Sequence, residues 1–448
     1  MKSRKTIFSQ LFTKKETACY APHSSMRFNH SGNVLACCFN RGNILGKFPD
    51  QSIHDIWFGE NIKNLRKSLH KNDFSLGCQT CEHDITCGNR EASGASQYDY
   101  LKNWKLHDKY PTMFDFELGS TCNFECIMCS GEYSSAIRKN REGGSPYYSP
   151  YEEHTNLFVE QLTPFLPHLK EMRFIGGEPF LMKVHYEIWD KVLEINPSII
   201  LNVLTNASIL NKRVQKMLEK GNFKISVSID SLVKETFESI RKNGDFNQVM
   251  NNVDFFQKLM KEQGHTMNFN LCVMRQNWSE IPAYFEYCNQ NDIKVVLHTV
   301  KFPAHCALWN LNSSELAEIE KIYSNVTFKS FSSTSVDNQE TFNGLYKQIK
   351  NWKKEASKKE MKLLEINPSK SSIDILHQRF NSNSIENQIS SKEEKWNLLI
   401  NILKRFSDEE QIKIIHFLNQ LEIHLIIAEL NVSSEDRIYE RFRIIIQN

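Results

Sequence analysis

Short segments in the middle of the chain alternate apolar and polar residues, and longer segments with helical periodicity separate them. The first alternating segment is Met113-Phe-Asp-Phe-Glu-Leu118. A period of two residues predicts strands, whereas apolar residues three and four positions apart predict helices. The predicted strands are residues 113–118, 171–175, 200–206, 224–230, 266–274 and 294–300, and the predicted helices are residues 183–194, 211–220, 246–262, 281–290 and 313–323.

This alternation predicts an α/β fold built on a parallel sheet. Consecutive strand–helix units join parallel strands through right-handed crossovers. Six units are too few for a closed barrel of eight strands, so the sheet should be open or only partly closed. Ligands of such sheets bind at the carboxyl ends of the strands, and we expect functional residues there.

The C-terminal third of the chain shows helical patterns without strands. Residues 338–362 predict a Lys-rich helix, and residues 367–391, with 11 Ser or Asn among 25, predict a linker. Two capping-box patterns begin at Ser391 and Ser407. They predict helices over residues 392–406 and 408–429, followed by a last helix over residues 434–446. This helical appendage either covers the barrel or binds a peptide or another partner.

Composition narrows the class of protein. The chain has 448 residues, of which 40% are hydrophobic and 24% charged, as in ordinary soluble globular proteins. A net charge of +2 gives no reason to expect a nucleic-acid partner or an acidic membrane surface. There is no run of 18 apolar residues and no apolar stretch typical of a secretory signal, so we expect a cytoplasmic protein with no membrane partner.

Cysteines carry most of the chemical information. Nine of the twelve lie between Cys19 and Cys129, which random core positions would not produce. Disulfides are not expected in a long chain without an export signal. Two kinds of site remain, zinc ligation and iron–sulfur ligation.

The tightest group is Cys122, Cys126 and Cys129, spaced C-x3-C-x2-C directly after the first predicted barrel strand. Three thiolates can hold three irons of a four-iron cluster and leave the fourth iron open for a substrate or cofactor. Structural zinc usually requires four ligands. No His or Cys follows Cys129 at a pairing distance, which favours iron–sulfur ligation over zinc.

A second motif, Gly176-Gly177-Glu178-Pro179, ends the second predicted strand. Two glycines allow the backbone to approach a ligand closely, although the motif alone is equally typical of a plain turn. Together with the three cysteines it resembles the radical S-adenosylmethionine (SAM) superfamily. The resemblance implies a partial (β/α)6 barrel. It also implies a [4Fe-4S] cluster on Cys122, Cys126 and Cys129 that binds SAM and cleaves it reductively. The resulting 5′-deoxyadenosyl radical abstracts a hydrogen atom from the substrate.

The resemblance also implies which residues contact SAM. The turn from Gly176 to Pro179 would bind its amino group, and Met128 replaces the aromatic residue that often packs near adenine. Ser228 and Arg241 match positions that contact the SAM carboxylate and ribose, and Thr205, Asn206 and Asp230 end neighbouring strands. Without the resemblance, Ser228 and Asp230 fit a capped strand end equally well.

Cysteines before the barrel form a second group. Their spacing resembles that of the SPASM domain or its shorter twitch form, which binds an auxiliary iron–sulfur cluster. The matching positions are Cys19, Gly32, Cys37, Cys78 and Cys81. Glu91 stands where a full SPASM pattern has a further cysteine, so the resemblance implies one auxiliary [4Fe-4S] cluster on Cys19, Cys37, Cys78 and Cys81. Cys38 and Cys87 are spare, and Cys87 is an alternative ligand. A zinc ribbon is the competing interpretation of the spacing.

These features predict three domains and leave the substrate open. The domains are an auxiliary-cluster domain over residues 1–105, a radical SAM barrel over residues 106–330 and a helical region over residues 331–448. Relatives with auxiliary modules often act on peptides, so we expect modification of a ribosomally made peptide or protein. An electron donor such as flavodoxin or ferredoxin would serve as partner. A small-molecule substrate, such as a sugar, an aminoglycoside or a nucleoside, and a non-enzymatic metal-binding module are the alternatives.

The reaction outcome depends on one further residue. Cys272 shares a strand face with Asn268 and Asn270, whereas Phe269 and Leu271 occupy the other face. If the polar face lines the barrel, the Cys272 thiol could return a hydrogen atom to a substrate radical, which would make the reaction an epimerisation. Cys272 is otherwise a small buried apolar residue. Cross-linking and dehydrogenation are the other outcomes.

Overall fold

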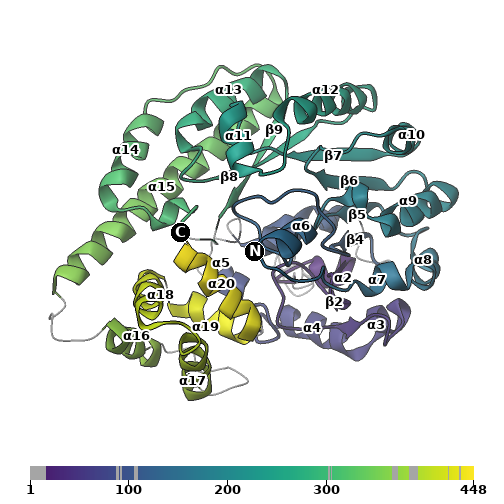
Figure 1. Ribbon diagram of the computed structural model, residues 1–448. Helices are drawn as coiled ribbons and strands as arrows, with labels where there is room; N and C mark the ends of the chain where they lie inside the picture. Colours follow the sequence, from purple (N-terminus) through teal and green to yellow (C-terminus); the bar gives the residue numbers. More distant parts are fainter. Residues whose placement is uncertain are drawn as a thin grey trace, which may run out of the picture.

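A single sheet organises most of the described chain. The computed structural model describes residues 17–86, 90, 93–104, 109–300, 303, 305–365, 372–382, 392–421, 423–432 and 435–447. The sheet has nine strands in the order β3-β2-β1-β4-β5-β6-β7-β8-β9. It is curved, and helices cover its outer side (Figure 1). These include α8 (Thr155–Leu162), α9 (Lys183–Ile195), α10 (Lys212–Lys220) and α12 (Phe246–Glu262).

Six parallel strands form the partial barrel that the sequence predicts. They are β4 (Met113–Phe116), β5 (Glu171–Phe174), β6 (Ile200–Thr205), β7 (Phe223–Ser228), β8 (Asn268–Val273) and β9 (Lys294–Thr299). Each pairs in parallel with the next. The fold class is therefore confirmed as an α/β partial barrel.

Three strands from the N-terminal region extend the same sheet, which the sequence pattern did not predict. They are β1 (Ser25–Phe28), β2 (Asn33–Leu35) and β3 (Gly46–Lys47). β1 lies parallel to β4, and β2 and β3 continue antiparallel from it. The cysteine-rich region is thus continuous with the barrel through backbone hydrogen bonds. The division into domains at residues 105 and 330 stays a prediction.

The two faces of the sheet differ in polarity. Register places Arg27, Asp115, Arg173 and Asn202 on one face, in four adjacent strands. The opposite face is apolar and packs under the helices; for example, the Phe174 ring lies 5.3 Å from Trp189 of α9. Because side chains alternate along a strand, one face builds the core and the concave face is left polar.

Buried charges join β1 to β4 on the polar face. Arg27 Nη1 lies 2.7 Å from Asp115 Oδ2, and its Nη2 contacts Glu117 Oε2. The side chains of Arg27 and Asp115 are only 6% and 7% exposed. His30 Nδ1 lies 3.5 Å from the other oxygen of Glu117. The cysteine-rich region is therefore fixed to the barrel by ion pairs that water hardly reaches.

The structure corrects several predicted boundaries. Helix α14 (Ser313–Tyr323) has the predicted bounds, and its cap is the preceding residue, Asn312, whose side chain accepts from the amide of Glu315. The predicted helix over residues 408–429 is two helices, α18 (Asp408–Gln420) and α19 (Ile423–Val432), because Leu421 adopts an extended conformation between them. The predicted linker contains α16 (Ser372–Asn381). The capping box at Ser407 is confirmed, whereas Ser391 lies outside the described residues.

The C-terminal helices have a hydrophobic core of their own. After the long helix α15 (Ser333–Glu365), this core includes Leu376, Leu399 and Ile414, from α16, α17 (Lys392–Leu403) and α18. Trp309, in the loop after β9, packs against this core and against a small apolar cluster around Met274 in the barrel. None of the described helices combines the length and apolarity needed to span a membrane.

Arg27→Leu should destabilise the fold by about 3–5 kcal/mol, because it leaves two buried carboxylates without their cation. Urea unfolding under anaerobic conditions, followed by circular dichroism, measures this. Lys47→Leu on the exposed β3 is the matched control and should change stability by no more than about 0.5 kcal/mol. Adding Asp115→Asn to Arg27→Leu should recover part of the loss. Equal stability of the Arg27 and Lys47 variants would contradict the role of the ion pairs.

Candidate functional site

The first cysteine site is the loop after β4, which the fold holds in a fixed path. The Glu125 amide donates to the Lys242 carbonyl at 2.9 Å, and the Ile127 amide donates to the Ile240 carbonyl at 2.9 Å. At the start of the loop, the Cys122 amide donates to Ser135 Oγ at 3.1 Å. The loop is thus pinned to the segment after β7 as well as to its own strand.

The thiols of Cys122, Cys126 and Cys129 lie close enough to affect one another's pKa. Burial raises the pKa of the Cys126 thiol to about 11, although Arg241 lowers it in part. Burial also raises the pKa of Cys129, with Cys126 and Cys122 adding to the effect, and the pKa of Cys122. Thiols so placed ionise only when a positive centre binds them. The donor set therefore fits an iron–sulfur cluster.

The Gly-Gly turn after β5 packs directly against this loop. Gly176 and Gly177 have φ of +81° and +50°, and a Cβ on Gly177 would lie 2.4 Å from the Thr121 carbonyl oxygen. The amide of Glu178 donates to the same oxygen at 2.7 Å. Only glycine allows this approach, so the two sequence motifs meet as the resemblance implies.

Glu178 itself is bound by protein groups. Its carboxylate accepts hydrogen bonds from Thr205 Oγ1 at 2.8 Å, the Asn206 amide at 2.7 Å and the Phe180 amide at 3.1 Å. Burial raises the pKa of Glu178 to about 7, against the opposing effect of these hydrogen bonds. Glu178 and Thr205 thus hold the ends of β5 and β6 together, and the predicted SAM contacts of both residues remain predictions.

Arg241 and Asp230 form a buried pair next to the first cysteine site. Arg241 Nη2 lies 2.8 Å from Asp230 Oδ2, and Nη1 lies 3.9 Å from Cys126 Sγ. Asp230 Oδ1 also accepts from the Cys272 amide at 2.8 Å. The other predicted SAM residues border this region: Ser228 ends β7 beside Asn270, Asn206 Nδ2 lies 3.9 Å from Cys122 Sγ, and Met128 packs against the core. The structure thus places Asn206, Arg241 and Asp230 at this loop, and the SAM contacts of these residues stay predictions.

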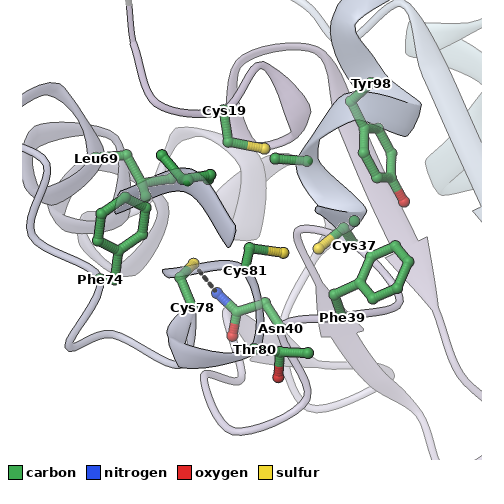
Figure 2. A pocket seen from close by; sticks show the side chains of 13 residues that line it. Cys19, Cys37, Phe39, Asn40, Leu69, Phe74, Cys78, Thr80, Cys81 and Tyr98 are labelled. Atoms are coloured by element: carbon green, nitrogen blue, oxygen red, sulfur yellow. Dashed lines mark hydrogen bonds between the residues drawn. The ribbon is translucent and has the colours of Figure 1, made fainter. Parts of the chain in front are cut away.

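The second cysteine site is a partly open pocket in the N-terminal region (Figure 2). It is lined by Cys19, Cys37, Cys78 and Cys81 together with larger side chains. Burial raises the pKa of both Cys19 and Cys78 to about 12. Apart from Asn40 and Thr80 the labelled lining is apolar or aromatic (Figure 2). Three buried thiols and the half-buried thiol of Cys78 around one space fit the predicted auxiliary cluster.

The spare cysteines are placed differently. Cys38 does not line the cavity, and its Sγ lies 3.8 Å from the Tyr98 hydroxyl. Cys87 lies outside the described residues. Among the described residues, no three His, Cys, Asp or Glu side chains converge as ligands of a single metal ion. A cubane does not require such convergence, because each of its thiolates binds a different iron.

Sequence reasoning missed several polar residues of these sites. Asn40 contacts Cys78, and Asn123 accepts from Asn206 Nδ2 at 3.0 Å. Arg27 and Glu117 form the charged contact between the two cysteine regions. Only their closeness to the cysteines in the sequence could have identified these two asparagines. Asn40 follows Cys37 by three residues, and Asn123 lies inside the three-cysteine motif.

The structure combines a partial barrel with two groups of cysteines whose thiols fit iron–sulfur clusters. Comparison with known protein families identifies the domains of the chain. The model of the radical SAM superfamily matches residues 116–288, and that of the SPASM iron–sulfur cluster-binding domain matches residues 19–82. The chain contains a radical SAM domain and, ahead of it, a SPASM iron–sulfur cluster-binding domain. The radical SAM domain implies SAM and a [4Fe-4S] cluster as cofactors, and the SPASM domain implies auxiliary iron–sulfur cluster binding.

Individual relatives match only parts of the chain. GTP 3′,8-cyclase of Limosilactobacillus fermentum is 23% identical over 197 residues, which are 43% of this chain and 55% of the relative. The probable GTP 3′,8-cyclase of Methanocaldococcus jannaschii is 26% identical over 181 residues, or 40% and 55%. The chain thus spans about half the length of these curated relatives.

Solved structures are similar at a lower level. Streptococcus suis SuiB bound to S-adenosylmethionine has a TM-score of 0.35 and 14% identity, covering 60% of this chain and 61% of that one. The protein anSMEcpe with bound AdoMet has a TM-score of 0.34 and 17% identity, covering 47% and 58%.

Anaerobic reconstitution should give about eight irons per chain, the sum of two four-iron clusters. Replacing Cys122, Cys126 and Cys129 together by Ala should leave about four, and so should replacing Cys19, Cys37, Cys78 and Cys81. Iron and sulfide analysis measures both. Cys38→Ala is the matched control and should keep all eight. Stoichiometric zinc without iron would falsify the cluster assignment.

Arg241→Ala should weaken SAM binding by about 1.5–3 kcal/mol, the scale of a hydrogen bond to a charged group. It should also destabilise the fold, because buried Asp230 loses its partner. The double variant Arg241→Ala/Asp230→Asn separates the two effects, since it removes both charges. If titration calorimetry finds SAM affinity restored in the double variant, Arg241 acts on the fold and does not contact SAM.

Proposed function

We propose that this radical SAM enzyme modifies a ribosomally made peptide or protein. The observation that supports this is the pocket lined by four cysteines, in a region whose strand β1 pairs with the first barrel strand. An auxiliary cluster in that pocket would be fixed relative to the barrel. It could take up the electron that a substrate radical must lose in an oxidative reaction, or bind the substrate directly.

The residues of this chain have distinct roles in the proposed reaction. When bound, SAM and its cluster supply a 5′-deoxyadenosyl radical that takes a hydrogen atom from the substrate. The turn from Gly176 to Pro179, with Ser228 and Arg241, orients SAM. On the concave face, Asn268 Nδ2 donates to Ser226 Oγ at 3.1 Å and Asn270 Oδ1 lies 2.9 Å from His298 Nε2, so the other polar atom of each amide would bind the substrate. Met128, packed on the apolar cluster of Met274 and Ala307, excludes water from the reacting atoms.

The electron donor is a second protein in this proposal. A low-potential carrier such as flavodoxin or ferredoxin would supply the electron to a cluster held by Cys122, Cys126 and Cys129. The near-neutral charge of the chain gives no reason for a nucleic-acid partner.

The test compares substrate classes with the same enzyme. Reconstituted protein, SAM and dithionite are incubated anaerobically with peptides encoded by short reading frames beside its gene, with GTP, or with no substrate. We expect the peptide to increase 5′-deoxyadenosine and to change in mass. GTP is included because curated relatives carry the name GTP 3′,8-cyclase. Turnover of GTP alone would assign a small-molecule substrate. The variant with Cys122, Cys126 and Cys129 replaced should form no 5′-deoxyadenosine.

Epimerisation is the outcome to test at Cys272. Burial raises the pKa of this thiol, so it keeps its proton, and the side chain packs against the same apolar cluster as Met128. An S–H bond there can give a hydrogen atom to a substrate carbon radical. The thiyl radical left behind would need one electron, which the low-potential carrier would supply through a cluster held by Cys19, Cys37, Cys78 and Cys81, and one proton from solvent.

Cys272→Ala should therefore abolish deuterium incorporation at the product carbon in deuterated buffer, measured by mass spectrometry with the peptide substrate. Cys288→Ala, buried in helix α13 (Ile281–Gln290), is the matched control and should keep it. Wild-type product at the wild-type rate from Cys272→Ala would make cross-linking or dehydrogenation the leading outcome.

A further inference from the structure

Asn40 lies against the auxiliary-cluster cavity and has its side chain fixed on both sides (Figure 2). Its Nδ2 donates to Cys78 Sγ at 3.2 Å and to the Leu76 carbonyl at 3.0 Å. Its Oδ1 accepts from the Asn43 amide at 3.2 Å. Because a carbonyl can only accept and a backbone amide can only donate, these partners determine which end of the side chain faces the sulfur.

The chain makes room for this side chain. Gly77, directly before Cys78, has φ of +77°, and a Cβ there would lie 2.3 Å from Asn40 Oδ1. Any other residue at position 77 would displace the amide of Asn40. The glycine and the hydrogen bonds are independent observations of one arrangement, in which Asn40 is only 1% exposed.

The surroundings strengthen the N–H···S hydrogen bond. Phe39, Leu69 and Phe74 line the same cavity, so few solvent dipoles compete with the amide. Cys19 receives a backbone donor, the Ala21 amide at 3.4 Å. Among the described residues, Asn40 is the side chain that donates a hydrogen bond to one of the four cysteines of the cavity.

We propose that Asn40 is a positioning residue that raises the reduction potential of the auxiliary cluster through its hydrogen bond to Cys78. The proposal rests on the auxiliary cluster with Cys78 as a ligand. Reduction adds negative charge to the cluster and its thiolates, and an N–H aimed at one sulfur stabilises that charge. Hydrogen bonds to the sulfurs are among the factors that set iron–sulfur potentials. A higher potential makes the cluster a better acceptor for an electron from a substrate radical.

The test measures the potential directly, without substrate. It uses the variant with Cys122, Cys126 and Cys129 replaced by Ala, so that the auxiliary cluster is the one observed. Asn40→Leu removes the donor at similar volume, and a redox titration followed by electron paramagnetic resonance should show a more negative midpoint. Thr80→Val, at the same cavity, is the matched control and should leave the midpoint unchanged. Iron content should stay at about four in all three proteins.

A second variant guards against misfolding. Gly77→Ala keeps Asn40 but displaces its amide, and it should shift the midpoint in the same direction. An unchanged midpoint in Asn40→Leu with full iron content would overturn the proposal. So would loss of iron from both variants, which would make Asn40 a residue of the fold alone. None of these outcomes depends on the peptide substrate, so failure here is distinguishable from failure of the proposed function.

Discussion

The structure depends on one buried cation shared by two carboxylates. Arg27 of β1 pairs with Asp115 and Glu117, which belong to β4 and its end, where water hardly reaches. Burial would raise the pKa of Glu117, but His30 and Arg27 hold it below its ordinary value, so the carboxyl stays charged. Removing one partner of such a pair costs far more than the pair contributes. β1 therefore cannot shift its register against β4 without leaving a buried charge unpaired.

The ion pairs of Arg27 fix the two cysteine sites relative to each other. Cys37 follows β2, which pairs with β1, and Cys122 follows β4, so the two groups of ligands are carried by one short stretch of sheet. An electron acceptor and a radical source serve one substrate only if their separation is constant. A separate domain on a flexible linker would not provide that, whereas backbone hydrogen bonds and buried ion pairs do.

Sequence alone predicts the regular half of this molecule. The six barrel strands and their helices follow from periodicity, since each buries one apolar face. The sequence did not predict β1, because a charged residue, Arg27, in a strand of four residues is typical of an exposed segment. The burial of Arg27 is explained only by its two carboxylate partners, which lie 88 and 90 residues away in the sequence. The same limit applies to Asn40, whose contact with Cys78 spans 38 residues. By contrast, Cys122, Cys126 and Cys129 and the Gly-Gly turn are local motifs, and sequence identified both.

The two cysteine sites also differ in the charge of the polar side chains next to their sulfur atoms. At the first site Arg241 approaches Cys126, but Asp230 pairs with the same guanidinium, so the nearby field is that of a compensated pair. A neighbouring opposite charge reduces the effect of a cation on any third group. At the second site the uncharged amide of Asn40 donates to the sulfur of Cys78. In the proposed reaction, a cluster on Cys122, Cys126 and Cys129 would donate an electron to SAM, and a cluster at the second site would accept one. The compensated ion pair and the N–H donor favour these two directions of electron transfer.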